Sequence, residues 1–218
     1  KYGDLFTPRQ LTALVTFSDL VGEAIERCKQ DAVAAGLADD NKNLEGGGYG
    51  ATAYAEALGT YLACSISRLA DYGCSLATWR PKDNAMRSGM PKQALQMSWD
   101  FAEGSPFAKS SSGFLECCQV VAKVIETALS GEVPGHAFQF SATAASFPDA
   151  VGNAIVSTDP PYYDNIGYAD LSDFLYVWTR RSLRLIYPTM FATVAVPKTE
   201  ELVASPYRHG SKQNAEQF

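Results

Sequence analysis

The pattern of apolar and polar residues divides the chain into two parts. Up to about residue 131, apolar side chains recur at the three-to-four-residue spacing of helices with one buried face. The pattern predicts a helix from Thr7-Pro8 to about Gly36, a second from Tyr54 to Tyr72, and a third from Phe114 to Leu129. Thr7 is suited to be the N-cap and Pro8 the first helical residue. We therefore expect a mostly helical region over 1–131.

The segments between these helices have weaker sequence signals for secondary structure. Residues 39–50 are polar and then glycine-rich, which is typical of a flexible loop or linker. Residues 79–90 contain turn-forming residues and are expected to be irregular. Pro91 is expected to open a short helix that carries Trp99, and Trp99 and Trp178 are interpreted as core residues.

The second part of the chain has a different period. Residues 136–141 alternate between apolar and polar side chains, which favours a strand. Residues 154–157 form a short apolar run that is typical of a buried parallel strand. A helix is predicted from Leu171 to Ile186, with Arg180, Arg181 and Arg184 on its solvated face. Strands and helices together favour an α/β unit over 132–218.

Composition narrows the classes of function. The 218 residues are 46% hydrophobic, enough for a buried core, and no run reaches the ~20 apolar residues of a membrane span. The net charge of −6 argues against strong autonomous binding to nucleic acid, which needs a basic surface. The chain opens at Lys1 without the features of a signal peptide, so we expect an internal piece of a longer cytoplasmic protein.

The cysteines do not suggest a metal centre. There are five, none in a C-x-x-C pair, and the chain has two histidines. A zinc site or a disulfide framework is disfavoured, and free thiols in a reduced compartment are expected.

The motif Asp159-Pro160-Pro161-Tyr162 suggests the chemistry. An exocyclic amino group on a planar base is a poor nucleophile, because its lone pair is delocalised into the ring. A carboxylate from Asp159 and the backbone carbonyl of Pro160 could accept both amino hydrogens and favour a pyramidal nitrogen. Two consecutive prolines restrict the backbone in advance, and Tyr162 offers a ring on which a flipped base can stack.

This motif resembles that of the amino-methyltransferases, which transfer a methyl group from S-adenosylmethionine. The longer stretch 158–178 is similar to a group of large prokaryotic adenine-specific DNA methylases, some of which carry zinc-ribbon modules. Residues 3–14, 68–72 and 197–210 also resemble that group. The resemblance implies a partial Rossmann-like fold over 132–218 and an adenine-N6 DNA methyltransferase. It makes Asp159 to Tyr162 catalytic and places Tyr163, Asp164 and Asn165 near the target base.

The chain departs from this family in its cofactor site. The Phe-x-Gly-x-Gly loop is absent, and Gly46 to Gly50 is interpreted as a linker because no strand precedes it. The zinc-ribbon cysteines are absent too. Phe6, Thr7 and Pro8 resemble a segment that flanks S-adenosylmethionine, although a plain helix cap explains them equally well. The resemblance therefore implies weak cofactor binding by this chain alone.

Several alternatives stay open. The target could be cytosine N4 or RNA, and the chain could be a non-catalytic interaction module, which the missing glycine loop and the acidic charge favour. The expected partner is DNA, through the full-length protein, with no membrane and no metal. The sequence does not predict the oligomeric state or the recognised DNA sequence.

Overall fold

The structure is a computed structural model, which describes residues 2–92, 94–128, 135, 137, 155–164, 166–199 and 201–217. The strand expected over 136–141 lies outside the described residues except for Ala137, which is not in a strand. Three helices expected in the first part of the chain, over 7–36, 54–72 and 114–129, are confirmed, with bounds that differ by a few residues.

Helix α1 (Pro8–Ala34) begins as its sequence predicts. The Thr7 side chain accepts a hydrogen bond from the Gln10 amide, and the Gln10 side chain accepts one from the Thr7 amide. This reciprocal capping box satisfies two amides that a helix start leaves without partners. A short 3₁₀ helix, η1 (Tyr2–Leu5), precedes it.

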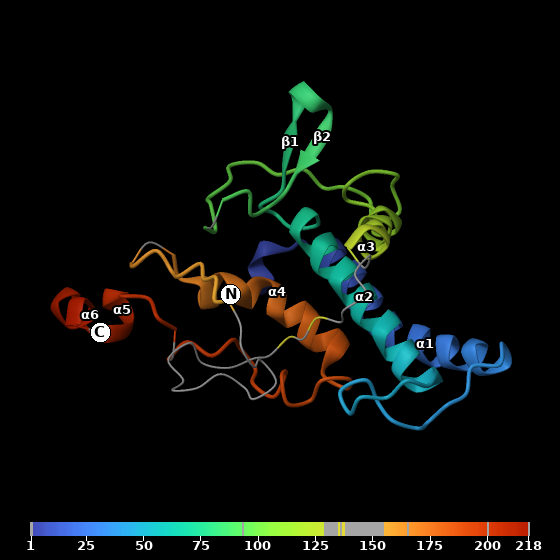
Figure 1. The fold of residues 1–218 in the computed structure, drawn as a ribbon. Coiled ribbons are helices and arrows are strands. Elements are labelled where there is room, and N and C mark those ends of the chain that lie inside the picture. The colour runs from blue at the N-terminus through green and yellow to red at the C-terminus, as the bar shows by residue number, and fades with distance from the viewer. Residues whose placement is uncertain are drawn as a thin grey trace.

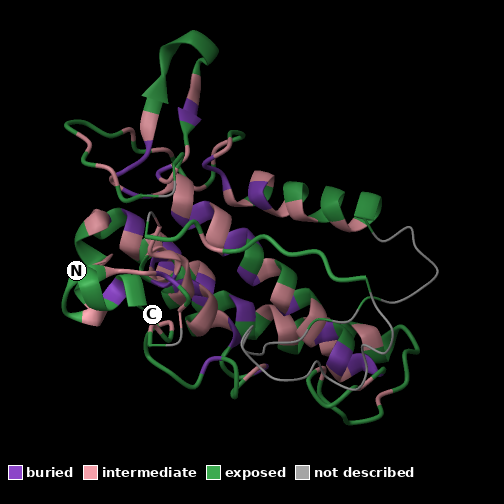
Figure 2. Cartoon of the chain, turned by 60° about the vertical axis from the view of Figure 1, so that its left-hand side comes forward, coloured by how far each residue is buried: buried purple, intermediate pink, exposed green. Residues whose placement is uncertain are grey.

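Helix α2 (Ala51–Tyr72) lies at the centre of the helical body, against α1, α3 and α4 (Figure 1). Its buried face is made mostly of small residues, among them Ala51, Ala55, Ala63 and Ala70. At Gly59 a β-carbon would lie 2.5 Å from the Ile25 side chain, so α1 approaches α2 closely at that point. Figure 2 shows that the buried residues face one another between the helices.

Helix α4 (Tyr168–Leu183) connects the second part of the chain to this body. Phe174 is fully buried and stacks on Phe6, with ring centroids 5.4 Å apart. Trp178 meets the edge of Phe6 at 5.3 Å and is 5% exposed, which confirms its predicted place in the core. Helix α3 (Phe114–Ala128) packs on α2 and buries Cys117.

Residues 79–90 are more ordered than expected. Strands β1 (Thr78–Arg80) and β2 (Ala85–Arg87) form an antiparallel hairpin around a 3₁₀ turn, η2 (Pro81–Asp83). Asn84 takes the left-handed conformation that closes the turn. The prediction of irregular structure was wrong because each strand has only three residues, too few for alternation to stand out.

Two other predictions were wrong. Residues 155–157 are exposed and irregular, with Ile155 99% exposed, so they form no buried strand. A strand needs neighbours that satisfy its backbone amides and carbonyls, and none pairs with this run in the described part of the chain. The helix expected from Pro91 is irregular where it is described, and Trp99 is 94% exposed.

The described residues thus contain one sheet, the two-stranded hairpin, beside a largely helical body. The chain ends in two short helices, α5 (Pro206–His209) and α6 (Lys212–Gln217). Within the described ranges, none of the helices has the length and apolar character needed to cross a membrane.

The aromatic cluster gives a stability prediction. Phe174→Ala should lower the free energy of unfolding by about 3–5 kcal/mol, because it removes a fully buried ring and leaves a cavity. Phe107→Ala is the matched control, since Phe107 is 85% exposed, and should cost less than about 1 kcal/mol. Equal losses in urea denaturation would show that the Phe6–Phe174 contact does not anchor α4.

Candidate functional site

The motif Asp159 to Tyr162 lies in an exposed irregular segment that leads into α4 (orange in Figure 1). Asp159 and Pro160 are exposed, and Tyr162 and Tyr163 are 57% and 58% exposed. Asp164 is also exposed, and Asn165 lies outside the described residues. Two aromatic rings and two carboxylates are therefore available to a ligand from solvent.

A tight turn follows the two prolines. The Tyr163 amide donates to the Pro161 carbonyl over 3.0 Å, and Tyr163 has a φ of +54°, in the left-handed region. That conformation is unfavourable for a residue with a side chain and needs support from its surroundings. In the described part of the chain, the Asp159 carboxylate and the Pro160 carbonyl have no hydrogen-bond partner. The turn thus engages the second proline's carbonyl and leaves the first one available.

The support for this turn comes from residues 193–199 and 201–208, which we call the strap. The strap runs back along α4 toward the motif. The Thr193 carbonyl accepts from the Tyr176 hydroxyl, and Lys198 pairs with Asp173 at 2.6 Å. Farther along, the Ala204 amide donates to the Tyr163 carbonyl over 3.0 Å.

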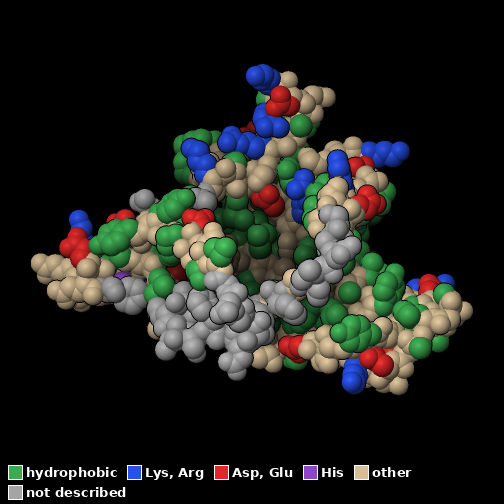
Figure 3. Space-filling view, in the orientation of Figure 1, with side chains coloured by type: hydrophobic (Ala, Val, Ile, Leu, Met, Phe, Trp, Pro, Cys, Tyr) green, Lys and Arg blue, Asp and Glu red, His purple; other side chains and the backbone are tan. Residues whose placement is uncertain are grey.

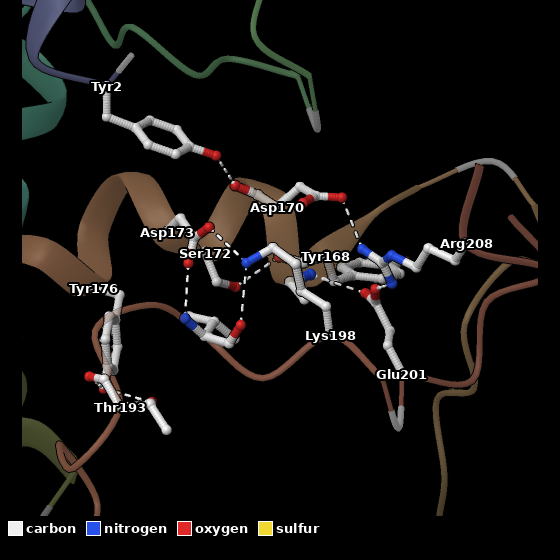
Figure 4. Close-up of polar contacts among 12 residues, drawn as sticks. Tyr2, Tyr168, Asp170, Ser172, Asp173, Tyr176, Thr193, Lys198, Glu201 and Arg208 are labelled. Carbon is white, nitrogen blue, oxygen red and sulfur yellow. Dashed lines mark hydrogen bonds and ion pairs between the residues drawn. The ribbon is translucent and has the colours of Figure 1, made fainter.

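A polar cluster holds the strap at the start of α4 (Figure 4). The Ala169 amide donates to Glu201 over 2.8 Å, which supplies the cap that Gly167 cannot provide with a side chain. Arg208 forms an ion pair with this same carboxylate, and its other terminal nitrogen contacts Asp170 at 2.7 Å. The Glu201 and Arg208 side chains are 12% and 18% exposed, so their charges depend on each other for compensation.

The sequence did not single out these charged residues as a cluster. The available signal is that 197–210 carries the charged residues Lys198, Glu201 and Arg208, while the first two turns of α4 carry Asp170 and Asp173. That pattern shows its meaning only after the strap is known to run back along α4.

The three residues suggested for cofactor contact have different surroundings, and Pro8 is the one of them that lines a groove. Phe6 is 7% exposed within the core, so its ring is not available to a ligand. The Thr7 hydroxyl accepts from Gln10 and donates to Glu103 over 3.2 Å. Pro8 lines a groove of about 820 Å³ between α1 and residues 103–107, a volume in the range of small-molecule sites. None of the motif residues lines this groove.

The groove has a charged rim. Arg9 donates to both carboxylate oxygens of Glu103, at 3.2 Å and 2.7 Å. These hydrogen bonds hold the pKa of Glu103 below its usual range, so the carboxylate is ionised at neutral pH. The floor is apolar and includes Leu14 and Phe17.

The glycine-rich segment is not built to hold a phosphate. Asp40 accepts hydrogen bonds from the amides of Tyr49 and Gly50, at 3.1 Å and 3.3 Å. Asp39 accepts from the Thr52 amide and hydroxyl, so the two carboxylates cap the start of α2. The amides that an anion would use are thus already engaged by Asp40. Residues 39–50 thus form a loop, as predicted, but hydrogen bonds hold this loop against the start of α2.

The arginines of α4 have structural contacts. Arg181 forms a bidentate pair with Asp19 of α1, and the Arg180 side chain donates to the carbonyls of Phe191 and Thr193. Arg184 is exposed. The prediction of a solvated face is confirmed for Arg181 and Arg184, although Arg181 also pairs with α1. It was wrong for Arg180, which is half-buried and joins α4 to residues 191–193.

The described part of the chain contains no group of three or more His, Cys, Asp or Glu side chains that could hold a metal ion. All five cysteines are free, as predicted. Burial raises the pKa of the Cys117 thiol to about 11, so this cysteine is protonated at neutral pH and is a poor nucleophile.

Comparison of the chain with protein-family models, curated proteins and solved structures finds no match.

The polar cluster leads to a prediction about the turn. Arg208→Ala leaves Glu201 without its partner and should release the strap, so hydrogen exchange at the Ala204 amide should accelerate at least about tenfold. Lys212→Ala removes a long, exposed ion pair and is the control. Unchanged exchange in Arg208→Ala would mean that the cluster does not hold the turn.

The Asp39 cap predicts a pH dependence. Hydrogen bonds from Thr52 lower the pKa of Asp39 from 3.8 to about 2, so its contribution to stability is present above about pH 4. That contribution is lost as the pH falls toward 2. The difference in Tm between the wild type and Asp39→Asn should therefore shrink between about pH 4 and pH 2. A difference that stays constant across this range would contradict the assignment.

Proposed function

We propose that this chain carries the target-base site of an S-adenosylmethionine-dependent DNA amino-methyltransferase that prefers adenine N6. The observation that carries the proposal is the exposed Asp159-Pro160-Pro161-Tyr162 segment, whose Asp159 carboxylate and Pro160 carbonyl have no hydrogen-bond partner among the described residues. These are the two acceptors that an exocyclic amino group needs.

In the proposed reaction, Asp159 and the Pro160 carbonyl each accept one amino hydrogen of a base that has left the duplex stack. The nitrogen lone pair then points out of the base plane toward the methyl donor. A nitrogen–carbon bond forms as the sulfur–carbon bond of the donor breaks, and the nitrogen afterwards loses one proton. S-adenosylmethionine supplies the electrophilic methyl group, and no covalent enzyme intermediate forms.

The two tyrosines complete the proposed base site. Tyr162 provides the stacking ring, and a base–aromatic stack contributes about 1–3 kcal/mol. The strained Tyr163 turn, held by Ala204, fixes the direction in which that ring leaves the backbone. This arrangement positions the ring and the acceptors before the substrate arrives, which lowers the entropic cost of orientation.

The cofactor is proposed from the motif alone. Phe6 is buried, the Thr7 hydroxyl is engaged by Gln10 and Glu103, and the Tyr49 and Gly50 amides already donate to Asp40. No residue of the described ranges is therefore assigned to S-adenosylmethionine, although the groove beside Pro8 has a suitable volume.

The proposal is tested with the natural full-length protein, labelled S-adenosylmethionine and duplex DNA. Asp159→Ala should abolish methyl transfer while the thermal unfolding midpoint is retained, because Asp159 is exposed and makes no contact that supports the fold. Asp100→Ala is the matched control, since Asp100 is an exposed loop carboxylate that should leave the rate unchanged.

The modified nucleoside identifies the target. N6-methyladenine is the expected product, whereas N4-methylcytosine or label in RNA would move the assignment to one of those substrates. An Asp159→Ala variant with wild-type activity would overturn the catalytic proposal. A wild-type protein that transfers no methyl group to any nucleic acid would favour the interaction module.

A further inference from the structure

The β1–β2 hairpin carries positive charge on an otherwise acidic chain. Residues 78–92 contain four cationic side chains and one acidic one, Asp83, a net charge of +3, whereas the whole chain has a net charge of −6. The cationic residues are Arg80, Lys82, Arg87 and Lys92. Figure 3 shows blue side chains gathered on the hairpin, which projects from the helical body.

The strand register places the two arginines on one face. Thr78 pairs with Arg87, and Arg80 pairs with Ala85, so these four side chains share a face of the hairpin. Met86 leaves the opposite face and is 8% exposed within the core. The buried methionine therefore fixes which side of the ribbon presents the arginines.

The charges on this projection are available. Lys82 and Arg87 are exposed, and neither forms an ion pair in the described part of the chain. Arg80 pairs with Asp83 at 2.7 Å, but both side chains are about half exposed. Such a pair contributes little to stability, so its arginine can exchange partners at small cost.

The hairpin also connects to the surface near the motif. Met90, Pro91 and Lys92, which follow β2, line a cavity of about 580 Å³ together with Tyr168 and Leu171 of α4. Helix α4 begins only a few residues after the motif. The base of the hairpin and the helix that follows the motif are thus two walls of one cavity.

We infer that the β1–β2 hairpin binds the phosphate backbone of duplex DNA through Lys82 and Arg87, with Arg80 able to join when it leaves Asp83. Phosphate contacts fix the register of a protein on a duplex, and a two-stranded ribbon fits the major groove. The choice of DNA as the polyanion rests on the proposed function.

The test measures binding without catalysis. Fluorescence anisotropy of a labelled DNA duplex is followed against salt for the full-length wild type and for the double variant Lys82→Ala, Arg87→Ala. Loss of two phosphate contacts should reduce the magnitude of the log K versus log salt slope by about 2 and raise Kd roughly tenfold at 0.1 M salt. The control is Lys42→Ala, Lys212→Ala, which changes the net charge equally at exposed positions outside the hairpin.

The outcomes separate this inference from the proposed function. A double variant with the wild-type slope and Kd overturns the hairpin contact, even if methylation by the wild type is observed. A weakened double variant supports the hairpin contact even if Asp159→Ala retains methyl transfer. If the two double variants lose affinity equally, the effect is one of net charge, and the inference fails. A loss confined to duplex RNA would also overturn it.

Discussion

The close packing of three helices around α2 is the constraint on which the rest of the structure depends. Alanines and Gly59 line the buried parts of α2, and this lets the Ile25 side chain of α1 approach the α2 backbone. Small residues contribute little apolar area themselves, but they allow larger side chains on the neighbouring helices to reach each other. Phe6, which lies two residues before α1, stacks on Phe174, and this contact holds α4 beside the start of α1.

Once α4 is fixed, polar contacts determine the course of the segments on either side of it. The strap runs antiparallel to α4. Its Thr193 contacts Tyr176 in the helix, and its Ala204 contacts Tyr163, which lies before the helix. At the start of α4 the Ala169 amide, which the helix leaves without a partner, donates to Glu201, and farther along Lys198 pairs with Asp173. The apolar contacts thus fix the position of α4. The Glu201–Arg208 cluster then holds the strap against α4, and the strap supports the turn at Tyr163.

The sequence predicted the parts of the fold that arise from local regularity. The capping box at Thr7 and the apolar stripes of α1, α2 and α3 are local signals, and the structure confirms these helices. The apolar run 154–157 suggested a buried strand, but burial depends on partners elsewhere in the chain, and Ile155 is exposed. The hairpin was missed for a related reason, because three-residue strands are defined by their pairing rather than by their own pattern. For the site, four consecutive residues were enough to predict the motif from the sequence. The strap could not be predicted, because it depends on contacts between residues about 40 positions apart.

The positions of the charged side chains matter more for binding to a polyanion than the net charge of the chain. An overall charge of −6, taken alone, argues against binding to a polyanion, yet the electrostatic field near a surface depends on where the charges lie. Charges farther apart than the Debye length of about 8 Å at physiological salt are largely screened from each other. A projecting hairpin with exposed Lys82 and Arg87 can therefore attract a phosphate that the acidic body repels only weakly. That combination favours one orientation of a bound duplex, because the acidic faces are disfavoured while the hairpin is attracted. An acidic chain is thus compatible with the proposed DNA contact, in which a local cluster of cationic side chains meets the phosphates.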